Sequence, residues 1–417
     1  MHRRRPRQHP GLSRRRLPAL LPRDRRPIRI WPEVGAARAS GRSHRDPHRP
    51  TQRPVRPRSG EPPLMSSASL SARRGVGRDL CVGAAVFAAL AIVPFTGMSN
   101  YVLAQATLCL LWCAVVTQWN LVLGVAGILS IGNMAMFAAG GYAVALSGIY
   151  FGASPWATLP LAAVAGLVVS LIIGALTLRL RGPYVVVLTL AVAMVMYQLI
   201  VTDVGCFRQS LGVCYSFSGG ARGLTRYGDF GLAKLIGYGA VPIGHYFIAF
   251  ATLLVGTAFA IVVVHSPYGR AFQAMRDNET AAACRGLSVA KYQLIIFAAA
   301  GFFTGLAGGA YAGIMRTFGP NILELPTLLF LLSMMIVGGR GAIWGPLLGA
   351  ITVTFVDEAM RDVAQWRNTG VALVLIAILI FMPNGLAGQL NDLIARWMTR
   401  RKVSAPEPSA SPAAEAV

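Results

Sequence analysis

The chain has 417 residues, of which 54% are hydrophobic and 13% are charged, and its mean hydropathy is +0.54. Its apolar runs are too long for the core helices of a soluble protein, so a soluble enzyme is excluded and an all-α polytopic membrane protein is predicted. The formal net charge of +23 does not indicate a nucleic-acid-binding protein, because residues 1–64 alone contribute +14, from 18 Arg and 4 acidic residues.

The segment 1–64 is rich in Arg and Pro and contains no Lys, Phe, Tyr or Asn. It has no apolar run that could form a core or a signal peptide, so we expect disorder. A basic arm for anionic lipid or nucleic acid is one interpretation. The other, which the lack of residues with AT-rich codons favours, is GC-rich upstream DNA translated from a mis-assigned start, with the true start at Met65.

Ten apolar segments then follow in order, and we expect each to be a transmembrane helix; eight to ten crossings agree with the pattern, because the eighth and tenth segments are short. The segments are 80–98, 101–123, 127–148, 156–178, 184–202, 241–264, 292–314, 326–337, 346–360 and 371–382.

Basic residues orient these helices. Arg73, Arg74 and Arg78 precede the first segment and place the N-terminus inside. With ten crossings, both termini are cytoplasmic and the inner side receives about twice as many Lys and Arg residues as the outer side. The expected parts are a cytoplasmic N-terminus (65–79), a transmembrane domain (80–386) with an outer loop (203–240) and a cytoplasmic loop (265–291), and a cytoplasmic tail (387–417).

The third segment is interrupted by Ser130, Gly132 and Asn133. Backbone freed by such a break can face a water-filled path, so Ser130 and Asn133 are candidates for the substrate path. Hydrogen bonding between helices is the alternative role for them. The seventh segment carries a series of small residues, which predicts close helix packing.

Near the outer end of the fifth segment, Gln198 is a further substrate-path candidate, and Asp203 either lines a vestibule or marks the membrane surface. The following loop contains Ser218, Gly219 and Gly220, which form either a turn at the outer mouth or a plain loop. Cys206 and Cys214 lie in the same loop, where they pair or stay free according to the redox compartment.

The sequence contains no motif for catalysis, metal binding or a cofactor. The six cysteines form no CxxC or Cys/His pattern, and His245 and His265 stand alone. A GxxxxGK[ST] phosphate loop is also absent, so we expect the energy for any transport to come from a partner.

The loop 265–291 holds the largest charged block between apolar segments. Asp277 and Asn278 can cap a helix start, Glu279 suits its first turn, and Arg285 followed by Gly286 reads as a stop. This pattern predicts a helix of about two turns, which needs something to lie against because so short a helix is unstable alone. The alternative is an ordinary solvated loop.

Within that loop, Glu279, Ala282, Ala283 and Gly286 resemble the Glu-Ala-Ala and following Gly of the cytoplasmic coupling loop of bacterial ABC importer permeases. The stretches SPYGRAFQAMRDNETAAACRGLSVAKYQ, FFTGLAGGAYAG, GGRGAIWGPLLGA and FMPNGL are similar to the branched-chain amino acid permease family, in particular its longer membrane subunit. The resemblance covers about residues 103–386. One departure is the sequence from Ser130 to Asn133, where relatives often have Ser-Leu-Gly-His.

This resemblance implies a permease subunit of an ABC importer for branched-chain amino acids in the bacterial inner membrane. The implied partners are two cytosolic ATPase subunits, a homologous second permease subunit and a periplasmic solute-binding protein. The coupling loop would contact the ATPases. The alternatives are the same machinery with urea or short amides as ligand, and a stand-alone secondary transporter or channel, for which the ion-coupling charges expected in mid-membrane are lacking.

Overall fold

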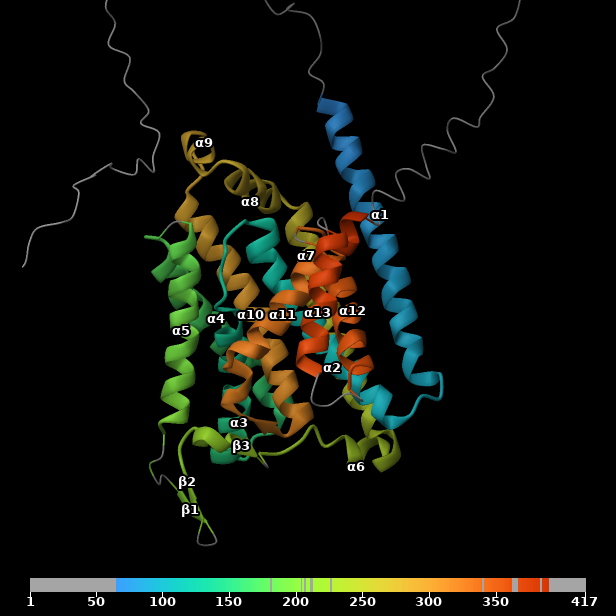
Figure 1. Ribbon diagram of the computed structural model, residues 1–417, viewed down its shortest axis with the longest axis vertical. Coiled ribbons are helices and arrows are strands. Elements are labelled where there is room, and N and C mark those ends of the chain that lie inside the picture. Colours follow the sequence, from blue (N-terminus) through green and yellow to red (C-terminus); the bar gives the residue numbers. More distant parts are fainter. Residues whose placement is uncertain are drawn as a thin grey trace, which may run out of the picture. The chain divides into compact units, whose positions relative to one another are not determined.

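The computed structural model describes residues 65–180, 182–203, 205, 208–210, 213–225, 227–339, 341–361, 367–382 and 385–389. The segment 1–64 and almost all of the tail 387–417 therefore lie outside the described residues. The described chain is mainly helical, and its long helices pack side by side (Figure 1), which confirms the predicted all-α class. The main helices are α1 (Met65–Ile92), α2 (Asn100–Asn120), α3 (Asn133–Phe151), α4 (Pro155–Thr177), α5 (Pro183–Val201), α7 (Val241–His265), α10 (Val289–Met315), α11 (Leu325–Gly338), α12 (Gly345–Ala359) and α13 (Arg367–Phe381).

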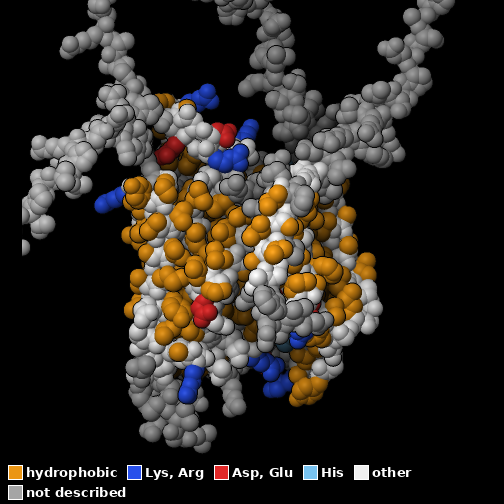
Figure 2. Space-filling model, viewed as in Figure 1, with side chains coloured by type: hydrophobic (Ala, Val, Ile, Leu, Met, Phe, Trp, Pro, Cys, Tyr) orange, Lys and Arg blue, Asp and Glu red, His pale blue; other side chains and the backbone are white. Residues whose placement is uncertain are grey.

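Among the described residues, six helical spans are long and apolar enough to cross a membrane, and they include all of α2, α3, α4, α5, α7 and α10. Figure 2 shows hydrophobic side chains over the middle of the bundle, with charged ones mainly near its two ends. Helices α11, α12 and α13 have 14, 15 and 15 residues. At about 21–23 Å they are shorter than a hydrocarbon core of about 30 Å, so the number of ten crossings stays a prediction.

The first helix differs most from its expected bounds. It begins at Met65 rather than near residue 80, so the segment expected as a separate N-terminus continues directly into α1. Its end comes earlier, at Ile92, where Pro94 enters a short 3-10 turn and Gly97 has a φ of +73°. The physical reason is that no proline interrupts residues 65–92, while Pro94 removes a helical N–H.

The loop 203–240 contains short strands and a short helix among its described residues. It contains a small hairpin of β1 (Arg208–Ser210) and β2 (Val213–Tyr215), then β3 (Leu224–Thr225) and α6 (Leu232–Ile236). Strand β3 pairs with β4 (Thr317–Phe318), which follows α10. Figure 1 places β1, β2 and β3 at one end of the bundle and α8 (Pro267–Asp277) and α9 (Glu279–Cys284) at the opposite end.

Close backbone contact joins α3, α4 and α10, as the small-residue series predicts. A Cβ built on Gly308 would lie 2.0 Å from the carbonyl oxygen of Phe137, and one on Gly140 would lie 2.0 Å from that of Gly305. The third helix, α4, approaches in the same way through Gly166. These contacts leave no room for any side chain, and the prediction of close helix packing is confirmed.

Gly308→Val should therefore disrupt the bundle, at a cost of about 3 kcal/mol or more, because the opposing atom is backbone and cannot rotate away. Gly77→Val is the matched control, since the same helical substitution there meets nothing within 4 Å. Fluorescence-detected size-exclusion chromatography after heating measures the difference. Equal melting temperatures for the two variants would contradict this assignment of α3 and α10.

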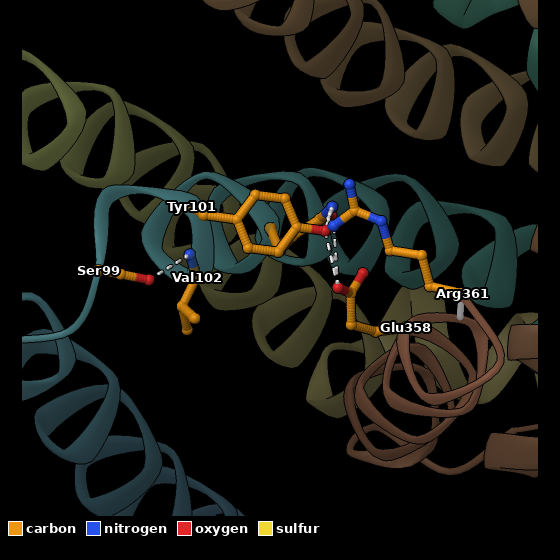
Figure 3. Close-up of polar contacts among 6 residues, drawn as sticks. Ser99, Tyr101, Val102, Glu358 and Arg361 are labelled. Atoms are coloured by element: carbon orange, nitrogen blue, oxygen red, sulfur yellow. Dashed lines mark hydrogen bonds and ion pairs between the residues drawn. The ribbon is translucent and has the colours of Figure 1, made fainter.

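Helix α2 is the most enclosed of the six spans: 89% of its most apolar stretch is buried, against 22% for α5. Its first turn is fixed to the end of α12 (Figure 3). Tyr101 donates a hydrogen bond to Glu358 Oε1 at 2.7 Å and accepts one from Gln105 Nε2 at 2.8 Å. The guanidinium of Arg361 lies over the Tyr101 ring, 4.5 Å from its centroid. Helices α2 and α12 are thus joined at this end.

Candidate functional site

The segment between α7 and α10 forms two helices, α8 and α9, where the sequence predicted only the second. Ser266 caps α8, because its Oγ accepts from Gly269 N–H at 3.4 Å, and Pro267 occupies the first turn. Phe272 is buried on the inner side of α8 with its ring 6.0 Å from that of Tyr292 in α10. The missed signals were the Ser-Pro start and the apolar spacing of Phe272 and Met275, and the result is a helix anchored on the bundle.

Helix α9 follows at once and has the predicted form. Asn278 caps it through Oδ1, which accepts from Ala281 N–H at 3.0 Å, whereas Asp277 ends α8. At its other end, Gly286 has a φ of +86° and donates to Ala283 O at 2.9 Å. Leu287 N–H donates to Ala282 O at 3.2 Å, which completes a Schellman stop. The predicted cap, two-turn length and glycine stop are confirmed.

The four predicted coupling residues share α9 and its stop but lie on different sides. Ala282 is buried, at 3% exposure, while Glu279, Ala283 and Gly286 are exposed. Glu279 and Ala283 line a cleft of about 640 Å³ whose other walls are residues 126–129 and the turn between α4 and α5. Ala282 lines a second cleft of about 590 Å³, between α8 and α9. Contact of these residues with an ATPase stays a prediction.

Arg276, at the end of α8, connects this element to the bundle. Its Nη1 donates to the carbonyl oxygen of Gly124 at 2.8 Å, within the π-helical turn Leu121–Val125 that ends α2. Its stem lies directly on Gly127, where an added Cβ would meet Arg276 Cγ at 2.3 Å. The last four carbonyls of a helix have no partner within it, and Arg276 donates to one of them.

Asn120, the last residue of α2 before this turn, holds the connection between α11 and α12. Asn120 is buried, at 4% exposure; its Nδ2 donates to Ala342 O at 2.9 Å and its Oδ1 accepts from Gly341 N–H at 2.9 Å. We name the set of Asn120, Gly124, Arg276 and the turn 341–342 the joint. It brings together residues up to 222 positions apart in the chain. Sequence reasoning missed both Arg276 and Asn120; the only signal was a polar residue, Asn120, inside an apolar run.

The substrate-path candidates are not brought together. Ser130 and Asn133 are buried at 2% exposure in the break before α3, where Ser130 O accepts from Trp119 Nε1 at 2.7 Å and Asn133 Nδ2 donates to Val115 O at 3.4 Å. The Asn133 side chain thus makes the contact between helices that was its alternative role, whereas the Ser130 Oγ accepts locally from Gly132 N–H at 3.3 Å. Gln198 lies far from them near the other end of α5, with its side chain exposed. Their part in a substrate path stays a prediction.

Cys206 lies outside the described residues, so its pairing with Cys214 stays a prediction; Cys214 itself lies opposite Gln209 in the hairpin of β1 and β2. Within the described ranges, no three His, Cys, Asp or Glu side chains are grouped so that they could hold a metal ion.

The comparisons with known proteins agree with this architecture. The profile of a family described as "branched-chain amino acid transport system / permease component" matches residues 101–383. The high-affinity branched-chain amino acid transport system permease protein LivM of Salmonella typhimurium is 25% identical over 291 residues, which cover 67% of this chain and 68% of the relative. LivM of Escherichia coli K12 is 25% identical over 302 residues, with the same coverage.

A relative named for a different ligand is the autoinducer 2 import system permease protein LsrC of Shigella flexneri. It is 28% identical over 177 residues, which cover 40% of this chain and 50% of the relative. No solved structure matches the chain. Since the family profile spans most of the helical bundle, from the first turn of α2 to beyond α13, this chain belongs to the family of branched-chain amino acid transport system permease components.

Proposed function

We propose that this chain is a permease subunit of an ABC importer that moves branched-chain amino acids across the bacterial inner membrane. It works with two cytosolic ATPase subunits, a homologous second permease subunit and a periplasmic solute-binding protein. The end that carries α8 and α9 faces the cytoplasm, with both chain termini, and the end that carries β1, β2 and β3 faces the periplasm. The two LivM relatives are named as permease proteins of a high-affinity branched-chain amino acid transport system, which supports Leu, Ile and Val as the proposed ligands.

The observation that carries this proposal is the construction of α8 and α9. A six-residue helix is unstable in water, yet α9 is capped at both ends and presents Glu279 and Ala283 on an open surface. Such a helix suits insertion into the cleft of a partner. The ATPase is that partner, and Glu279, Ala282, Ala283 and Gly286 form the coupling contact with it.

Coupling then follows from the joint. When the ATPases close on ATP, they move α9, and α8 moves with it because the two helices pack together. Arg276 carries this movement to the end of α2, and Asn120 carries it on to the turn between α11 and α12. The helices rock around a central path, which is alternating access by motion of packed elements. The break at Ser130 and Asn133 and the outer position of Gln198 are its proposed substrate contacts.

The test is uptake into proteoliposomes that contain this chain together with its partner permease, ATPase and binding proteins, sought among the products of neighbouring genes. Leucine should accumulate only with ATP, and a partner ATPase without its phosphate-loop lysine should abolish the accumulation. Competition by Ile and Val, but not by urea or acetamide, should define the ligand class. Uptake by this chain alone under an ion gradient would contradict the proposal and indicate a secondary transporter.

The LsrC relatives are import permeases for a different ligand. If uptake requires ATP but Leu, Ile and Val are not transported, the proposed ABC importer stands and only the proposed ligand is wrong.

A further inference from the structure

A pocket opens at the end of the bundle opposite α9, between α5, α10 and the turn η5 (Pro320–Leu323). It has a volume of about 490 Å³, within the range of roughly 300–1,000 Å³ that is typical of small-molecule sites. Arg222, Asn321 and Glu324 line it. Among the described residues, no hydrogen bond or ion pair joins the side chain of Arg222 or Glu324 to another group. The pocket therefore has one cation and one anion available for a ligand.

Arg222 stands on a turn that is fixed from two sides. The Asp203 carboxylate accepts from Ser218 N–H at 2.6 Å and from Ser218 Oγ at 2.7 Å. These hydrogen bonds hold the pKa of Asp203 below its usual value, so the carboxylate stays charged and keeps the turn in place. On the other side, Gly223 touches Gly319, where an added Cβ would lie 2.6 Å away, and β3 pairs with β4. The backbone that carries Arg222 is thus held in place by these contacts.

The floor of the pocket is aromatic. Tyr311 of α10 and Phe318 of β4 line it, with their ring centroids 6.1 Å apart. Behind them the rings continue into the bundle, since Tyr311 lies 5.5 Å from Trp112 and from Phe137, and Phe318 lies 5.0 Å from Tyr142. Phe318 is almost wholly covered, at 1% exposure, whereas Tyr311 is half-buried and offers part of its ring as apolar surface to a ligand side chain.

We propose that this pocket is an outer binding site for a small zwitterionic amino acid with an apolar side chain. The inference rests on the proposed function and names residues for it. Arg222 binds the carboxylate, Glu324 binds the ammonium group, and Tyr311, which packs against Phe318, receives the side chain. Arg222 and Glu324 are both exposed, and a zwitterion offers an opposite charge to each of them, whereas urea or a short amide offers none and an anionic lipid headgroup offers one only to the arginine.

Equilibrium binding of radiolabelled leucine tests this proposal, with the complete permease and ATPase complex in nanodiscs and without the binding protein. Arg222→Gln and Glu324→Gln should each weaken leucine binding about tenfold, because each removes a charge-assisted hydrogen bond. Lys234→Gln is the matched control: it removes an exposed charge from the same loop, outside the pocket lining, and should bind leucine as the wild type does.

Ligand analogues separate recognition from a general loss of structure. Leucinamide lacks the carboxylate, so its binding should be weak and unchanged by Arg222→Gln but reduced by Glu324→Gln. The anion 4-methylpentanoate lacks the ammonium group and should show the opposite pattern. A uniform loss for all three ligands would overturn the assignment of Arg222 and Glu324.

Two further outcomes would also overturn the inference. If both variants bind leucine normally but need more binding protein for half-maximal ATPase stimulation, the charges dock a protein and not an amino acid. If both variants behave as Lys234→Gln does while the wild type takes up leucine, the site lies elsewhere and the proposed function stands. A wild-type complex that neither binds nor takes up Leu, Ile or Val would overturn the proposed function together with this site.

Discussion

Gly286→Val should reduce uptake at least about tenfold and reduce copurification of the ATPase in parallel. Gly286 ends α9 at a φ of +86°, and a β-branched residue is strained by roughly 1–2 kcal/mol in the left-handed region. An added Cβ meets nothing within 4 Å, so the expected effect comes from the backbone and not from a clash. Because α9 has only six residues, losing its stop unfolds the contact that we assign to the ATPase.

The matched control is Gly286→Asn, since asparagine adopts the left-handed conformation far more readily than valine does. It adds a larger side chain at the same exposed position but should keep most of the uptake. The affinity of the binding protein for leucine should stay constant in both variants. Normal ATPase copurification with Gly286→Val would refute the coupling role of α9, and equal defects in both variants would indicate steric obstruction instead of backbone strain.

The sequence was most informative where structure depends on near neighbours. The cap at Asn278 and the stop at Gly286 involve hydrogen bonds over three to five residues, and residue types alone predicted them. The apolar segments likewise correspond to helices, because the membrane requires continuous helical hydrogen bonding. The small-residue series predicted close packing but not the partner, since Gly308 and Phe137 are far apart in the chain.

The joint could not be predicted for the same reason. Asn120 binds the backbone of Gly341 and Ala342, and Arg276 binds that of Gly124, over separations of 152 to 222 residues. Every residue has a backbone carbonyl, so the residue type does not indicate which carbonyl will accept a hydrogen bond from a distant side chain. These partners are therefore known only from the packing of the helices. From the sequence, Arg276 was interpreted only as one more positive charge on the expected cytoplasmic side.

Substitution of Arg276 therefore tests most directly whether movement of α8 and α9 is coupled to the helical bundle. Arg276→Ala removes a charge-assisted hydrogen bond to Gly124 and the stem that lies on Gly127, but it leaves α9 and its caps in place. We therefore expect the ATPase to bind and to hydrolyse ATP at nearly the wild-type rate, while uptake falls about tenfold. The measurement is the ratio of leucine transported to ATP hydrolysed in proteoliposomes.

Two further variants decide whether the joint causes that change. Arg270→Ala removes an exposed arginine from the same helix, where the side chain has no hydrogen bond to the described residues, and should leave the ratio unchanged. Gly124→Ala disrupts the joint at the end of α2, because its Cβ would meet Asn120 Oδ1 at 2.0 Å and Gly341 N at 2.5 Å. It should lower the ratio as Arg276→Ala does, although it replaces no residue of α8 or α9. A parallel loss of ATPase binding in Arg276→Ala would place this residue in the docking surface, and an unchanged ratio in Gly124→Ala would show that movement reaches the bundle by another route.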